Sequence, residues 1–127
     1  MLLMRHISVR LKLAERELEK IVIGEKTGAY AVSGIWIRLP EERWQHIVEE
    51  HPELEELRQE VLLTIRKPFR VLAGSRGELL AVREITPAKF LVVVYRETSS
   101  NDGFIITAFL TRKVGQLEKR VIIWPKQ

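Results

Sequence analysis

The sequence predicts an α+β protein in which two consecutive helices pack on a four- or five-stranded antiparallel sheet, preceded by an N-terminal β segment. Residues 89–97 and 103–111 are rich in β-branched and aromatic residues, as strands are, and turn-forming residues fill the link between them. Between residues 41 and 66, apolar residues recur at the three- and four-residue spacing of helices. We expect one domain with a single core. Its parts are the β segment at 1–39, the helices at 40–67 and the sheet at 68–127.

The composition restricts the chemistry. The 127 residues include no cysteine, which excludes disulfides, thiolate metal ligands and cysteine catalysis and fits the reducing cytoplasm, where we expect the protein. No apolar run approaches the roughly 18 residues of a membrane-spanning helix, so we expect no membrane partner. The sequence also lacks a Gly-rich phosphate loop, an H-E-x-x-H motif and a nucleophile-elbow serine. We therefore expect neither a metal nor an organic cofactor.

Charge is unevenly distributed along the chain, whose formal net charge is +4. Residues 39–67 carry four Lys and Arg against eight acidic residues, whereas residues 68–127 carry ten against five. A basic surface attracts a phosphate backbone, because each neutralised phosphate releases counterions. Solubilising charge on exposed strand faces explains the same excess. The charge pattern alone leaves both interpretations open.

The alternation of polar and apolar residues in the N-terminal third of the chain predicts a small β-meander. Residues 5–13 alternate polar and apolar side chains with the period of two of a half-buried strand, and His6 falls on the solvated side. The other expected elements are a helical turn at 14–20 or a strand at 19–24, a turn at 25–28, and a strand at 30–39. These strands join the main sheet or pair between chains, and the sequence does not decide which.

Two helices are expected in the middle of the chain. Pro40 suits the first turn of a helix, where its missing N–H costs nothing. One stripe of this first helix is buried and consists of Trp44, Ile47, Val48 and His51. Pro52 disfavours helical angles at the residue before it, so the first helix should end there. The second helix should begin at Pro52 and continue to Arg66.

The runs of strand-forming residues in the C-terminal half of the chain predict five strands. They are expected at 69–74, 78–85, 89–97, 103–111 and 119–124, with a polar connection at 112–118 that allows one helical turn. The two strands at 89–97 and 103–111 are too apolar for an exposed ribbon and should lie at the centre of the sheet. Polar side chains interrupt them, and a buried polar group costs free energy unless it is hydrogen-bonded. Such positions need a structural or a functional reason.

The residues left as candidates for chemistry are histidines near the helix break and cationic or hydroxyl side chains in or beside the sheet. They are His46, His51, Arg83, Tyr95, Thr107, Thr111, Arg112 and Lys113. Cleavage of RNA by its own 2′-hydroxyl needs a general base, a general acid and cations around the phosphate, and no metal. This set of residues suits that reaction.

Each candidate also has a structural interpretation. His51 lies on the apolar stripe, where a capping or core histidine is as good an interpretation as a catalytic one. His46 is about 140° away around an ideal helix, so both rings reach one phosphate only if the chain bends at Pro52 or the substrate is long. Thr107 suits a strand for packing reasons alone. Arg83 shares a face with apolar residues and must find an anion there, either a carboxylate or a phosphate.

Four segments carry a resemblance to a known group. They are the "H-I…H-P-E" helix within 44–54, Ile-Arg-Lys-Pro at 65–68, Phe-Leu-Val-Val-Val-Tyr at 90–95 and Gly-Phe-Ile-Ile-Thr-Ala-Phe at 103–109. The sequence resembles small prokaryotic and phage-associated domains that are similar to the superfamily grouping barnase, EndoU, colicin nuclease domains and RelE-type toxins. The resemblance covers about residues 40–112 and implies a metal-independent, toxin-like endoribonuclease whose open sheet face binds RNA.

Residue roles follow from the resemblance by position. His46 and His51 match the helix histidines, Arg83 a basic residue of the second sheet strand, and Thr107 the threonine of the T-A strand. We expect proton transfer by one of the histidines, phosphate contacts from Arg83 and Arg112, and positioning by Thr107. The other substrate contacts are assigned to Tyr95, Thr111 and Lys113.

The implied partners are RNA and an antitoxin or immunity-type protein. Two alternatives remain beside the nuclease. The same basic sheet would serve a non-catalytic nucleic-acid- or protein-binding module, or the polar strand residues would pair internally in a chiefly structural subunit. The sequence does not determine the oligomeric state.

Overall fold

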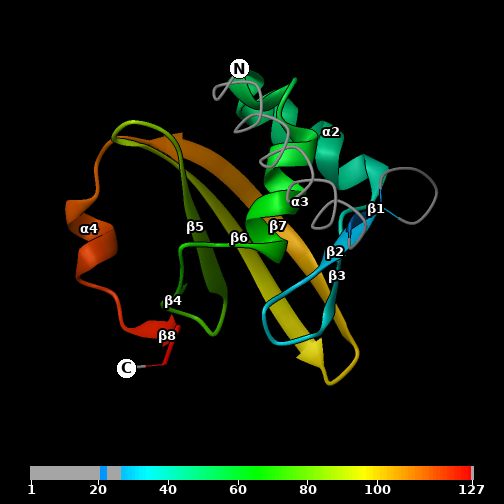
Figure 1. Ribbon diagram of the computed structural model, residues 1–127. Helices are drawn as coiled ribbons and strands as arrows, with labels where there is room; N and C mark the ends of the chain where they lie inside the picture. Colours follow the sequence, from blue (N-terminus) through cyan, green and yellow to red (C-terminus); the bar gives the residue numbers. More distant parts are fainter. Residues whose placement is uncertain (1–20, 23–26, 127) are drawn as a thin grey trace, which may run out of the picture.

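The computed structural model describes residues 21–22 and 27–126, which form one eight-stranded mixed sheet with helices on both faces (Figure 1). The strand order is β1-β2-β3-β7-β6-β5-β4-β8. The strands are β1 (Ile21–Val22), β2 (Gly28–Tyr30), β3 (Trp36–Arg38), β4 (Arg70–Ala73), β5 (Leu79–Thr86), β6 (Lys89–Ser99), β7 (Asp102–Thr111) and β8 (Ile122–Trp124). The α+β class is confirmed. The expectations for 5–13, 14–20 and His6 lie outside the described residues.

The predicted central hairpin is the middle of the sheet. β6 and β7 pair in antiparallel register, with Val93 opposite Ala108, and the chain reverses at Ser100 and Asn101. A bulge between Val94 and Tyr95 shifts the register halfway along the pair. Both strands bury side chains of high β-propensity, which explains why this hairpin was predictable from composition alone.

The sheet is larger than the four or five antiparallel strands expected, and it is not purely antiparallel. β3 pairs with β7 in parallel, with Ile37 opposite Gly103 and Arg38 opposite Phe104. Arg38 also donates two hydrogen bonds to the Asp102 carboxylate, at 2.8 and 3.2 Å, and these lower the pKa of Asp102 below its usual value. The N-terminal strands therefore extend the main sheet along the first residues of β7.

The expectation of one strand at 30–39 is wrong, because two strands with a turn occupy this range. β2 ends at Tyr30 and β3 begins at Trp36, and Gly34 adopts a φ of +88° in the turn. Such an angle costs glycine nothing but strains other residues. The alternation of Ile35, Ile37 and Leu39 belongs to β3 and its flanking residues, and the turn at 32–34 lies before it.

The helices are α2 (Glu41–Glu50), the 3₁₀ turn η1 (Pro52–Leu54), α3 (Arg58–Arg66) and the short α4 (Gly115–Glu118). α2 ends where Pro52 predicts, since His51 has the non-helical angles φ −133° and ψ 73°. The second helix, however, does not begin at Pro52. The chain first forms the 3₁₀ turn, and Leu57 has non-helical angles before α3 begins. No helix in the described residues has the length and apolar composition needed to cross a bilayer.

Both faces of the sheet bury apolar side chains. Under α2 and α3, the sheet residues Ala81, Leu91, Val93, Tyr95 and Ile105 pack with Trp44, Ile47, Val61 and Ile65 of the helices. On the second face, a smaller cluster of Leu72, Leu80, Val82 and Val92 packs with Leu117 of α4 and Ile122 of β8. The face expected to be open to RNA is thus partly covered by the C-terminal segment.

Candidate nucleic-acid interface

The two histidines of the helical region each contact a glutamate. His46 is exposed on α2, and its Nε2 lies 2.8 Å from Oε1 of Glu50. His51 is the C-cap of α2; its Nδ1 lies 3.5 Å from Oε1 of Glu53, and its ring centroid lies 6.3 Å from that of Phe109 on β7. Of three surface pockets formed by described residues, one includes His46 and none includes His51. These pockets therefore do not bring the two rings together.

Arg83 connects β5 to α3. Its guanidinium group donates to the Glu60 carboxylate, to the Thr64 hydroxyl at 3.2 Å and to the Glu60 carbonyl at 3.3 Å. Only 22% of its side chain is exposed. The sequence allowed either a carboxylate or a phosphate as the anion beside Arg83. In the structure the guanidinium group is paired with a carboxylate of the protein itself, that of Glu60.

Tyr95 and Thr107 are both polar residues of the central hairpin, but their environments differ. Tyr95 belongs to the core under the helices and is 1% exposed. Burial, with a smaller contribution from the negative charge of Glu97, raises the pKa of its hydroxyl well above the usual value. Thr107 pairs with Val94, and its Oγ1 is buried without a hydrogen-bond partner in the described chain. The Tyr95 hydroxyl is therefore not displayed on the surface, whereas the Thr107 hydroxyl is unsatisfied.

The last three predicted residues lie at the end of β7. The Thr111 hydroxyl accepts a hydrogen bond from the backbone N–H of Lys113 at 3.0 Å. Arg112 donates to the carbonyl of Pro87 at 3.4 Å, and both Arg112 and Lys113 are exposed. The bonds made by Thr111 and Arg112 hold the strand end and the neighbouring β5–β6 turn.

Positive charge is concentrated elsewhere, at the edge where β4 pairs with β8. We call residues 66–74 and 118–126 the β4–β8 corner (Figure 1, lower left). Val71 pairs with Trp124, and the Ala73 N–H donates to the Val121 carbonyl at 2.9 Å, so the two segments lie side by side. The corner contains one acidic residue, Glu118, and six cations. The cations are Arg66, Lys67, Arg70, Lys119, Arg120 and Lys126.

Exposed apolar side chains lie among these cations. Phe69 is 63% exposed, and the Arg70 guanidinium carbon lies 5.2 Å from the centroid of its ring, in a cation–π contact. Trp124 is 37% exposed and borders a pocket of about 290 Å³ together with Val32, Arg66 and Lys67. Val121 and Ile123 of the β8 segment are exposed as well. Cations and aromatic rings are thus neighbours at two places in the corner.

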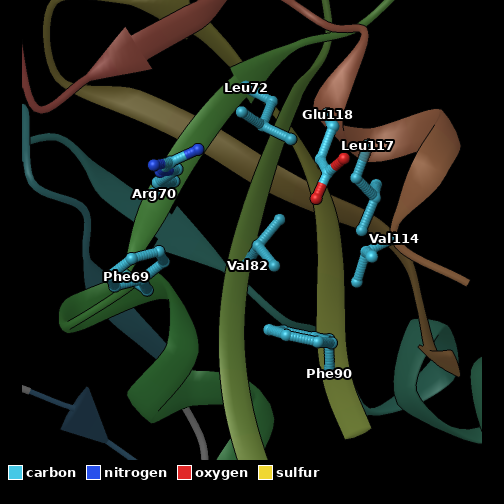
Figure 2. A pocket seen from close by; sticks show the side chains of 8 residues that line it. All are labelled: Phe69, Arg70, Leu72, Val82, Phe90, Val114, Leu117 and Glu118. Carbon is cyan, nitrogen blue, oxygen red and sulfur yellow. The ribbon is translucent and has the colours of Figure 1, made fainter. Parts of the chain in front are cut away.

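A second pocket, of about 220 Å³, lies between α4 and the second face of the sheet (Figure 2). Its lining residues are Phe69, Arg70, Leu72, Val82, Phe90, Val114, Leu117 and Glu118. The Glu118 carboxylate points into the space beside α4, and Arg70 lies across β5 from it. The pocket therefore has apolar walls and one charged group of each sign on opposite sides.

The corner offers contacts of two kinds. Its cations attract anions, and its exposed rings offer flat apolar surfaces on which planar groups stack. No group of three or more His, Asp or Glu side chains in the described part of the chain is placed to hold a metal ion. The described side chains of the corner therefore offer charge and stacking contacts.

The charge pattern of the sequence indicates the basic half of the chain but not the residues of the corner. Phe69 and Trp124 were assigned to the expected strands, where aromatic residues normally pack in the core. A usable signal was their neighbourhood: Lys-Pro-Phe-Arg at 67–70 and Trp-Pro-Lys at 124–126 place each ring next to a cation and a proline. Proline is confined to edge strands and strand ends, and Trp124 ends the edge strand β8 whereas Phe69 directly precedes β4.

Comparison of the chain with protein-family models, with curated proteins and with solved structures found no match.

Proposed function

We propose that this protein is a non-catalytic module that binds single-stranded nucleic acid at the β4–β8 corner. The observation that carries the proposal is the coincidence of six cations and a single acid with two exposed aromatic rings, Phe69 and Trp124. Cations neutralise phosphates and rings stack on bases, and proteins that bind single strands combine these two elements. A duplex keeps its base faces inside the stack, so exposed rings favour a single strand.

The endoribonuclease activity implied by the resemblance stays a prediction. In the described residues, His46, His51 and Arg83 each contact a carboxylate. A catalytic role would require these contacts to be exchanged for contacts with RNA. The binding module uses rings that are already exposed, Phe69 and Trp124, and it is the function that the geometry supports better.

Binding of labelled oligonucleotides by fluorescence anisotropy tests the proposal. We expect the protein to bind an unstructured RNA or DNA strand more tightly than a duplex of equal length. The Phe69→Ala variant should lose roughly tenfold in affinity, because stacking contributes about 1–3 kcal/mol per base. Its ring is mostly exposed, so the fold should tolerate the change. Arg43→Gln on α2 removes an exposed cation outside the corner and should bind like the unmodified protein.

Two outcomes would overturn the proposal. One is the absence of binding to any strand at low salt. The other is competition by poly-glutamate that equals competition by the oligonucleotide, with Phe69→Ala without effect, which would indicate an acidic protein partner. Denaturing gels of the same RNA, incubated in excess chelator with the unmodified protein and with His46→Ala and His51→Ala, test the predicted nuclease separately.

A further inference from the structure

The pocket beside α4 contains a carboxylate that the rest of the corner does not explain. Glu118 is the only acid among six cations, and it forms no ion pair with any of them in the described chain. A negative charge here repels the phosphates that the other side chains attract. Its carboxylate points into the space between α4 and β5, where the walls are apolar (Figure 2). A ligand that enters this space meets a hydrogen-bond acceptor.

The size and lining of the pocket fit a single flat ring system. A volume of about 220 Å³ lies below the usual range for drug-sized ligands, which begins at about 300 Å³. The rings of Phe69 and Phe90 lie toward one end of the pocket and Glu118 toward the other, with Val82 between them and Leu72 beside Glu118 (Figure 2). Arg70, which lies beside the Phe69 ring, places a cation across β5 from the Glu118 carboxylate. An unpaired base has the required flat apolar faces, and its own phosphate would meet Arg70.

The ionised carboxylate discriminates between bases because it only accepts hydrogen bonds. Cytosine presents an exocyclic amino group, which donates, and pairs well with Glu or Asp. Uracil has the same ring but presents a carbonyl oxygen at that position. That oxygen would face the Glu118 carboxylate, with two acceptors and no proton between them.

We infer that the pocket between α4 and the second face of the sheet holds one unpaired base of the bound strand, and that Glu118 selects an amino-bearing base such as cytosine over uracil. This inference rests on the proposed function, since the strand is held by the cations of the corner. It adds a base preference to what is otherwise binding by charge and stacking.

The test compares the octanucleotides of cytidine and of uridine, which differ only at the base, by anisotropy at pH 7.5. We expect the protein to bind the cytidine strand roughly tenfold more tightly, as one good carboxylate–amino contact implies. In the Glu118→Gln variant the preference should fall to within about twofold, because an amide both donates and accepts and so pairs with either base. Glu49→Gln, which removes an exposed carboxylate on α2, changes the net charge equally and should keep the preference.

A second variant tests the location. Val114 lines the pocket, and Val114→Phe should fill it and abolish the preference while leaving the salt-dependent binding in place. Circular dichroism and thermal unfolding establish that each variant is folded. Equal affinity of the unmodified protein for both strands, or a preference that survives Glu118→Gln, overturns the inference and leaves the proposed function intact. Failure to bind either strand overturns both.

Discussion

Thr107 Oγ1 is a buried side-chain oxygen that has no hydrogen-bond partner in the described chain. A hydroxyl buried in this way costs about 1–3 kcal/mol, whereas an apolar group of the same shape avoids that cost. We expect Thr107→Val to raise the free energy of unfolding by about 1 kcal/mol, measured by urea denaturation. Thr111→Val is the control, because Thr111 Oγ1 accepts a hydrogen bond from Lys113 and its removal should destabilise the protein slightly. A destabilised Thr107→Val would contradict the assignment of this oxygen as unsatisfied.

For Arg83, the sequence predicted the kind of partner but not its identity. Its position on an apolar strand face required an anion, and the structure supplies the Glu60 carboxylate. The choice between this carboxylate and a phosphate was not predictable, because the partner lies on a different element, α3. A similar limit applied to His51, whose capping position depends on where α2 ends. Residue chemistry defines what a side chain needs, and tertiary packing defines which group provides it.

Gly103 lies where β3 of the N-terminal segment packs closely against β7 of the main sheet. A Cβ at this position would lie 2.6 Å from Ile37 Cδ1 and 2.6 Å from the carbonyl oxygen of Arg96. Both distances are far below van der Waals contact, so only glycine allows β3 to approach β7 this closely. In the sequence, Gly103 stands where the turn-forming link meets the strand expected at 103–111, a position that suggests a turn residue rather than a close approach. The parallel joint was missed because nothing local distinguishes a turn glycine from a close-approach glycine.

We expect Gly103→Ala to lower the free energy of unfolding by about 2 kcal/mol, since overpacking at a tight contact forces backbone shifts. The matched control is Gly115→Ala, because no atom lies within 4 Å of the added Cβ and the residue begins α4. That variant should be as stable as the unmodified protein or slightly more stable. Thermal and urea unfolding of the two variants provide the comparison. Equal stability of both would contradict the close approach of β3 to β7.

The elements that sequence reasoning located best were those with long, uniform patterns. The strands expected at 89–97 and 103–111 agree with β6 and β7 to within two residues, and the first helix ends where Pro52 requires. The 3₁₀ turn before α3 and the reversal between β2 and β3 were missed. In the 3₁₀ turn the apolar spacing continues through Leu54 while the backbone direction alters, whereas the reversal at 32–34 comes before the alternating residues of β3. Periodicity records which side chains are buried, and it does not record such reversals.

Across the whole molecule, the charges divide between the helices and the C-terminal half. Residues 39–67 carry eight acids and four cations, whereas the β4–β8 corner carries six cations and one acid. α3 ends in Arg66 and leads directly into the corner, so its last turn belongs to the basic surface although most of the helical region is acidic. A nucleic-acid strand would therefore be attracted to one edge of the molecule and repelled from the outer surface of α2 and α3.

This division predicts how binding responds to salt. If each of the six cations neutralised one phosphate of a single strand, the slope of log affinity against log salt concentration would be about −4, since each contact contributes about −0.7. Lys67→Gln combined with Lys126→Gln should reduce the magnitude of the slope by about 1.4, whereas Arg43→Gln on the acidic helical side should leave it unchanged. Titrations between about 50 and 200 mM salt measure these slopes.

Because counterion release depends only on phosphate contacts, Phe69→Ala should weaken binding at every salt concentration while the slope is preserved. This result separates the contribution of stacking from that of charge. A slope near zero for the unmodified protein would mean that the cations of the corner do not contact phosphates.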